Sequence, residues 1–184
     1  TPAARYYPNN AYLHAMLLLA SLWIVFFSLH SLLAANAVKH WAERTLGQNA
    51  RYYRLAYNLF ATLLLAGILY LLFTMPSTFV YKANTPIAGY LLMAAGLVVM
   101  LMAFRNYDLG EFAGFKQLAQ KLHHPEKLQV TGLNRYVRNP LYTGIIVFVA
   151  GFFLYQPTQA NLVTAVIIYL YLYIGTKLEE QKLE

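Results

Sequence analysis

Long apolar stretches alternate with short polar ones along this chain. Five stretches contain no charged residue: Tyr12–Ala35, Leu55–Met75, Ile87–Phe104, Leu141–Tyr155 and Leu162–Thr176. A helix of about 20 apolar residues crosses the hydrocarbon core of a bilayer, and the last two, shorter stretches are separated by a tight turn that predicts a helical hairpin. We therefore predict an all-α integral membrane protein with about five transmembrane helices in a single domain, residues 1–184, whose three N-terminal spans lie within 12–104.

The composition supports this prediction. Hydrophobic residues make up 59% of the chain and charged residues 11%, whereas soluble domains carry about 25% charged residues. A soluble chain of this length lacks the interior volume to bury so many apolar side chains. There is no cysteine, so disulfides, thiol nucleophiles and thiolate metal sites are excluded. We predict no metal site.

The charges are unevenly distributed between the connecting segments. The net charge is +7, and most basic residues lie in segments 36–54 and 105–139, whereas segment 76–86 has only Lys82. Basic loops remain in the cytoplasm, which predicts a multi-pass protein of the inner membrane with its N-terminus outside and its C-terminus cytoplasmic. Val38, Trp41 and Ala42 recur at helical spacing, which predicts an interfacial helix. The expected partner is the lipid bilayer and not a nucleic acid; the sequence does not indicate an oligomeric state.

Two polar islands are candidates for chemistry. The first runs from Thr131 to Gly144 and leads into the fourth apolar stretch. Pro140 favours the first turn of a helix, where free N–H groups suit a carboxylate or phosphate, and Gly144 permits close approach. The second island ends the fifth stretch, where Glu179 and Glu180 sit near the negative end of the helix dipole. A cationic ligand would relieve their repulsion; the alternative is a solvated helix end with Lys177 and Lys182 as local partners.

The two islands together carry a resemblance. The sequence from Gly132 to Gly144, a hydrophobic hairpin, and then Leu178-Glu179-Glu180 with Leu183 resembles the catalytic half of the isoprenylcysteine carboxyl methyltransferase and phospholipid methyltransferase superfamily. The N-terminal half, from Phe27-Ser-Leu-His30-Ser31 to Arg54-Leu-Ala-Tyr57-Asn58, and Gly110–Gln117 are similar to the methanethiol S-methyltransferase and NnrU-like branch. The resemblance implies a membrane methyltransferase that uses S-adenosylmethionine, with cytoplasmic cofactor-binding motifs within 105–184.

The sequence departs from the family pattern at two points. Asn139 stands where many members have histidine, and it cannot shuttle a proton at neutral pH. The sequence ends at Glu184, whereas the family usually continues with a tail that helps to close the cofactor site. We therefore expect either a further segment or an incomplete site.

The resemblance also implies site residues. Glu179 or Glu180 would hold the cofactor amine. Its carboxylate would be held by Arg138, Asn139 and the N–H groups near Pro140. Aromatic faces would contact its adenosine or its sulfonium. The implied cofactor-binding set is Tyr136, Arg138, Asn139, Pro140, Tyr142, Gly144, Tyr173, Glu179 and Glu180. The predicted acceptor-binding set is His30, Arg54, Tyr57 and Asn58, for a small thiol or a lipophilic, isoprenylcysteine- or lipid-like acceptor. No catalytic residue is assigned.

Several alternatives remain open from the sequence. The protein could be a non-enzymatic NnrU-like membrane factor, or a membrane reductase of related architecture that uses NADPH. Arg51 and Arg54 could instead contact lipid headgroups or neighbouring helices. His14 and His30 lie about 160° apart around one helix, so they cannot share a ligand on one face.

Overall fold

The computed structural model describes residues 9–82, 86–105, 110, 114–115, 137 and 139–181, without the side chains of Asn9 and Glu179. The described chain is helical. Its elements are α1 (Asn9–Ala34), α2 (Asn36–Leu46), the 3-10 helix η1 (Gly47–Tyr52), α3 (Tyr53–Thr74), α4 (Ile87–Phe104), α7 (Pro140–Tyr155) and α8 (Gln159–Gln181). In hydrocarbon every backbone polar group must be satisfied within the segment, which is why long apolar runs become helices.

The predicted spans agree closely with these helices. Four helical stretches among the described residues are long and apolar enough to cross a membrane, and α7 is a shorter apolar helix. The third predicted span coincides with α4, and α8 extends beyond the predicted Leu162–Thr176 at both ends. The prediction of an all-α integral membrane protein is therefore confirmed. The helix predicted within segment 36–54 is α2, on which Ala42 is buried and Trp41 is 61% exposed.

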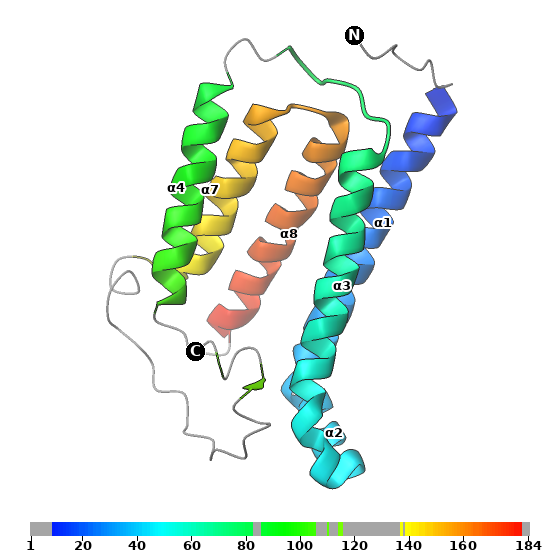
Figure 1. Ribbon diagram of the computed structural model, residues 1–184, viewed down its shortest axis with the longest axis vertical. Helices are drawn as coiled ribbons and strands as arrows, with labels where there is room; N and C mark the ends of the chain where they lie inside the picture. The colour runs from blue at the N-terminus through cyan, green and yellow to red at the C-terminus, as the bar shows by residue number, and fades with distance from the viewer. Residues whose placement is uncertain are drawn as a thin grey trace.

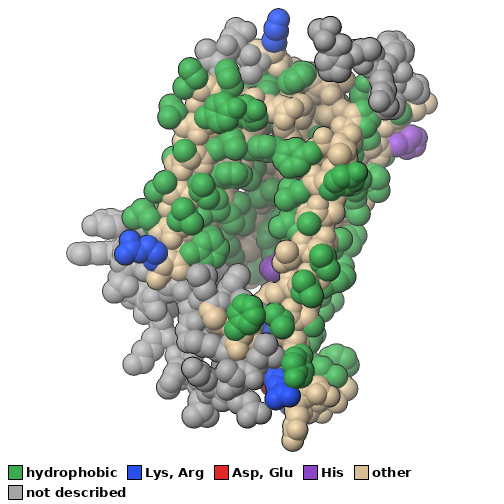
Figure 2. Space-filling view, in the orientation of Figure 1, with side chains coloured by type: hydrophobic (Ala, Val, Ile, Leu, Met, Phe, Trp, Pro, Cys, Tyr) green, Lys and Arg blue, Asp and Glu red, His purple; other side chains and the backbone are tan. Residues whose placement is uncertain are grey.

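The helices form a bundle in which neighbours pack in the order α4, α7, α8, α1 and α3 (Figure 1). Apolar side chains cover the visible faces of the bundle, and Lys and Arg side chains lie toward its two ends (Figure 2). Leu63, Phe73 and Leu91 are each at least 64% exposed. Such large apolar surfaces are unfavourable in water and are expected where a helix faces lipid.

Helices α4 and α7 approach each other through glycine. A Cβ atom built on Gly89 would lie 2.5 Å from the backbone N of Tyr155, and one on Gly96 would lie 2.5 Å from that of Phe148. Gly144 and Gly151 of α7 face α4 in the same way. Small residues at helix interfaces let backbones pack directly in membranes. These four glycines, hereafter the glycine seam, hold α4 against α7.

The other helices pack through large side chains. Leu19 and Trp23 of α1, Ile68 of α3 and Ala160 of α8 form a buried apolar cluster. Trp23 donates a hydrogen bond from Nε1 to Oγ1 of Thr164 on α8 at 3.0 Å. This buried polar pair and the apolar cluster fix α1 and α3 against α8.

The turn between α7 and α8 is joined to the end of α3. The N–H of Val80 donates to the carbonyl of Pro157 at 2.8 Å, and the N–H of Gln159 donates to the carbonyl of Thr78 at 2.9 Å. The N–H of Ala160 also donates to Oγ of Ser77. These hydrogen bonds satisfy backbone groups at the start of α8. They also fix the α7–α8 hairpin relative to α3, and the two polar islands lie at the opposite end of this hairpin.

Candidate functional site

Helix α7 begins at the first polar island. Pro140 is its first residue and Asn139 is its N-cap, whose side-chain oxygen accepts a hydrogen bond from the N–H of Tyr142 at 3.4 Å. The prediction that Pro140 opens a helix is confirmed. The capping role gives a structural reason for asparagine here, since Asn is among the best N-cap residues. The capping hydrogen bond also uses the side-chain oxygen of Asn139, which is part of the carboxamide predicted to hold the cofactor.

Tyr142 points from α7 toward α8. Its hydroxyl oxygen lies 3.8 Å from the position that a Cβ on Gly175 would occupy. One layer further along the hairpin, the hydroxyl of Tyr169 donates to the carbonyl of Ile146 at 3.0 Å. The start of α7 therefore packs against the last turns of α8 that precede the second polar island.

Three other residues of α8 lie on a different side of this helix from Gly175. Tyr173, Lys177 and Glu180 lie within about 60° of one another around α8, and Gly175 lies about 160° from Tyr173. Tyr173 is 64% exposed and lies on a different side of α8 from Gly175, which Tyr142 approaches, so its part in the cofactor site stays a prediction. Glu180 accepts an ion pair from Lys177, with Nζ and Oε2 3.0 Å apart. This is the local pairing that the solvated-end alternative proposed, and an exposed pair of this kind adds little stability.

Gly144 faces a helix and not an open site. A Cβ there would lie 2.6 Å from Cγ of Met100 and 2.9 Å from its backbone N. The sequence correctly predicts a close approach at Gly144, but the group that approaches is α4. The part in cofactor binding that the resemblance implies for Gly144 stays a prediction.

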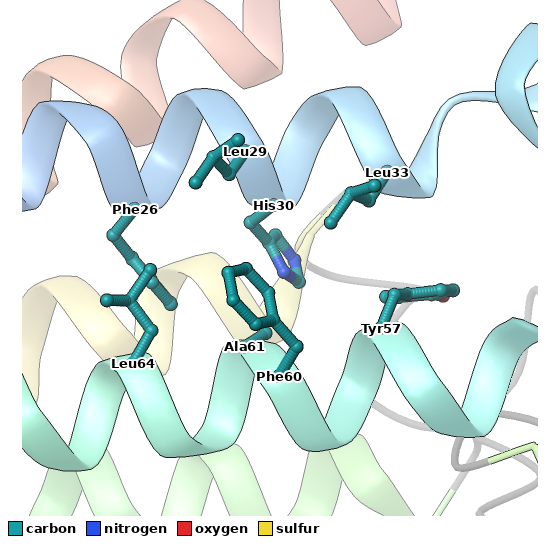
Figure 3. Close-up of a pocket in the computed structure, with 8 residues that line it drawn as sticks. All are labelled: Phe26, Leu29, His30, Leu33, Tyr57, Phe60, Ala61 and Leu64. Carbon is teal, nitrogen blue, oxygen red and sulfur yellow. The ribbon is translucent and has the colours of Figure 1, made fainter.

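Two predicted acceptor residues come together between α1 and α3. His30 points from α1 toward α3, with Phe60 on one side and Tyr57 on the other (Figure 3). Tyr57 is 8% exposed, and the ring of Phe26 stacks on the imidazole with centroids 5.9 Å apart. The crevice is too narrow for a water molecule, and the described residues that line it come from α1 and α3 and do not include Tyr142 or Glu180.

Arg54 and Asn58 adjoin Tyr57 on α3, and the chain comes close to this point again at Gly114. Gly114 has a φ of +97°, and a Cβ on it would lie 2.9 Å from the backbone N of Leu55 and 3.2 Å from Cβ of Arg54. Tyr53, at the start of α3, donates from its hydroxyl to the carbonyl of Leu33 at 2.8 Å. The predicted acceptor residues thus cluster where α1 ends and α3 begins.

A larger space lies between α1 and α8. This groove has a volume of about 340 Å³, and its walls are mostly apolar, with hydroxyl groups from Ser28, Ser31 and Tyr171. Ser31 and Tyr171 share a hydrogen bond at 3.0 Å, and Tyr171 stacks on Phe27 with centroids 4.0 Å apart. Ser31 belongs to the N-terminal motif that begins at Phe27, whereas nothing in the sequence pattern distinguishes Tyr171 from the other tyrosines of α8.

Three predicted cofactor residues lie outside the part of the chain that the structure describes. They are Tyr136, Arg138 and the side chain of Glu179. The described members are Asn139, Pro140 and Tyr142 at the start of α7, Gly144 in the glycine seam, and Tyr173 and Glu180 on α8.

Residues 84–184 match the family model for phospholipid methyltransferases. This chain belongs to the phospholipid methyltransferase family. The match covers more than half of the 184 residues and includes α4, α7 and α8. Comparison with curated proteins and with solved structures gave no match.

Membership confirms the predicted superfamily, because the phospholipid methyltransferases are part of the isoprenylcysteine carboxyl methyltransferase-like superfamily. It supports a membrane methyltransferase, in agreement with the apolar helices of a multi-pass membrane protein. Both polar islands and the glycine seam lie within the matched residues. His30, Arg54, Tyr57 and Asn58 lie in the preceding part of the chain.

Proposed function

We propose that this phospholipid methyltransferase family member transfers a methyl group from S-adenosylmethionine to a small thiol or a lipophilic acceptor within the membrane. The observation that carries the proposal is the family match over residues 84–184, which contains both polar islands at one end of the α7–α8 hairpin. When bound, the cofactor supplies an electrophilic methyl group on a sulfonium centre.

The described side chains suit this cofactor chemically. Glu180 offers a partly exposed carboxylate for the cofactor amine, and Asn139 offers a carboxamide for its carboxylate. The ring of Tyr142 lies beside Gly175 between the two helices, where an aromatic face attracts a cation. Arg138, Tyr136 and Glu179 extend this set in sequence. Holding donor and acceptor in line, away from water, is the main contribution that such a site makes to methyl transfer.

The acceptor is proposed to arrive through the bilayer. The groove between α1 and α8 is apolar with a few hydroxyl groups, and the crevice at His30 and Tyr57 is at the same end of α1 as Ser31. Polar groups inside a membrane are costly unless they meet each other, water or a ligand. This arrangement suits a molecule with an apolar body and one reactive polar atom, as in the methanethiol S-methyltransferase-like branch or in lipid acceptors.

Calorimetric titration with S-adenosylhomocysteine tests cofactor use. Glu180→Ala is expected to weaken binding by about 1–3 kcal/mol, the cost of losing a charge-assisted hydrogen bond. Glu43→Ala is the matched control, because Glu43 is an exposed carboxylate paired with His40 on α2 and lies outside the matched residues. Equal affinity of both variants for S-adenosylhomocysteine would show that Glu180 is only a local partner of Lys177.

The same titration separates the alternatives. Affinity for NADPH without affinity for S-adenosylhomocysteine would favour the reductase, and affinity for neither would favour a non-enzymatic NnrU-like factor. A transfer assay with labelled cofactor against a panel of thiols and lipids would then identify the acceptor class.

The proposed orientation, with the C-terminus in the cytoplasm of the inner membrane, is tested by labelling. Because the chain has no cysteine, Lys82→Cys and Arg44→Cys each carry a single reactive thiol. An impermeant reagent added outside intact cells is expected to label the first and not the second. Labelling of both from outside would contradict the orientation.

A further inference from the structure

His30 is a polar residue with mostly apolar neighbours. Its Nδ1 atom is buried and has no hydrogen-bond partner among the residues that the structure describes. It sits near the end of α1, a helix long and apolar enough to span the membrane. A buried polar atom left without a partner costs free energy, and an ionisable residue inside a span is a candidate for function.

Among the residues that the structure describes, one other titratable side chain lines the crevice around His30. It is Tyr57 of α3, and the remaining described lining residues are apolar: Phe26, Leu29, Leu33, Phe60, Ala61 and Leu64. Arg54 lies about one turn before Tyr57 on α3. From α8, Tyr171 contacts Phe27 and Ser31, which flank His30 on α1. Of these described side chains, the imidazole of His30 is the one best suited to take a proton.

Methyl transfer to a thiol requires such a base. A thiol sulfur attacks well only as the thiolate, and general bases in enzymes are most often histidine. We propose that His30 takes the proton from the thiol of the methyl acceptor; this inference rests on the methyl transfer proposed above. The S–H bond breaks, its proton goes to Nδ1 of His30, and the sulfur keeps the electron pair. That pair forms the new bond to the transferred methyl carbon as the bond from this carbon to the donor sulfur breaks. When the methylated product leaves the opened crevice and water replaces it, His30 gives its proton to that water.

Access to Nδ1 runs past one side chain. Phe60 lies at the edge of the crevice (Figure 3) and is 47% exposed. A ring with half its surface outside can turn away without displacing the buried cluster. The acceptor then enters between α1 and α3 from the bilayer, and Tyr57 orients it beside the imidazole.

The test compares two thiols in the full-length protein. Ethanethiol is weakly acidic and needs a base, whereas pentafluorothiophenol is already ionised at neutral pH. His30→Gln keeps a polar side chain but cannot take a proton, so it is expected to lower turnover of ethanethiol by roughly 100-fold or more. Turnover of pentafluorothiophenol should change by less than about threefold, because no proton transfer is then needed. His14→Gln, the same substitution at an exposed position on the same helix, is the matched control and should change neither rate.

A second readout does not involve turnover. Ethanethiol bound to the wild type without cofactor is expected to show increased ultraviolet absorbance from its thiolate, and His30→Gln should abolish the increase. If His30→Gln does not fold, His30→Ala assayed with added imidazole replaces it, and recovery of ethanethiol turnover supports the proposal.

Other outcomes overturn the inference. An equal loss with both thiols would mean that His30 supports packing only, and unchanged rates with both would mean that it has no role. A wild type that binds S-adenosylhomocysteine and methylates lipids but no thiol would refute the inference and leave the proposed function intact. A wild type that neither binds S-adenosylhomocysteine nor transfers methyl groups would refute both.

Discussion

Helices α4 and α7 pack against each other in a different way from helices α1 and α8. In the glycine seam, backbone meets backbone, and added Cβ atoms would lie as close as 2.5 Å to backbone atoms of the facing helix. Between α1 and α8, large side chains keep the backbones apart and are joined by the Trp23–Thr164 hydrogen bond and the Phe27–Tyr171 stack. The second arrangement leaves a groove of about 340 Å³.

This difference in packing shows which helix contact can change to accommodate a ligand. A backbone cannot rotate away from a neighbour, so the glycine seam has one arrangement and fixes the start of α7. Side chains can change rotamer, so α1 and α3 can make room for a ligand at the groove or at His30. The seam lies within the residues that match the family model, whereas the adaptable contacts depend on α1 and α3 outside it.

The largest expected effect is at the glycine seam. Gly96→Ala puts a methyl group where the backbone of Phe148 lies and is expected to lower the free energy of unfolding by about 1–3 kcal/mol, as overpacking does. Gly67→Ala on α3 is the control, because nothing lies within 4 Å of a Cβ there. It should be neutral or stabilising by up to about 1 kcal/mol, since alanine favours helix more than glycine.

Reversible unfolding in mixed micelles measures both variants. If Gly96→Ala were as stable as Gly67→Ala, direct backbone contact would not describe how α4 meets α7. Gly89→Ala, at the opposite end of the seam, should behave like Gly96→Ala and repeats the test at Tyr155.

A smaller effect is expected at Trp23. Thr164→Val keeps the volume of the side chain but removes the acceptor for the indole N–H, and should cost about 1 kcal/mol, in the range measured for hydrogen bonds between membrane helices. Adding Trp23→Phe to the Thr164→Val variant isolates the pair in a double-mutant cycle. Additive losses would show that the hydrogen bond contributes nothing beyond the packing of each residue.

The smallest effect is expected at the groove itself. Ser31→Ala removes the exposed hydrogen bond to Tyr171 and should lower the free energy of unfolding by about 0.5 kcal/mol, the low end for such bonds, because the Phe27–Tyr171 stack remains. Thermal unfolding in detergent measures it. A loss larger than that of Thr164→Val would reverse the ranking of the two contacts between α1 and α8.

The sequence predicted the helices well because span length and apolarity are local properties. The apolar run Ile87–Phe104 is bounded by Pro86 and by the charged Arg105, and proline is favoured in the first turn of a helix, as at Pro140. The glycine seam was missed, although Gly89 and Gly96, like Gly144 and Gly151, are seven residues apart. That spacing places each pair on one helix face, but only the fold shows that the two faces meet.

The site was predicted less completely than the fold. His30 and Tyr57 were both predicted to bind the acceptor, and the structure places them in one crevice. Tyr142 and Tyr173 were grouped by their nearness to the two islands, but rotation about α8 separates them. Helix rotation depends on packing partners such as Ile146, whose carbonyl binds Tyr169, and a single sequence does not specify those partners.

The shortness of α7 has a consequence for the surrounding lipid. With 16 residues at about 1.5 Å each, this helix is roughly 24 Å long, less than the ~30 Å of a typical hydrocarbon core. A short span is accommodated by local thinning of the bilayer. Because the glycine seam prevents α7 from sliding along α4, the thinning falls on the lipid beside the hairpin. Thinning at the Asn139 end of α7 would bring the headgroup layer closer to this residue, where a water-borne molecule and a lipid-borne molecule could then meet.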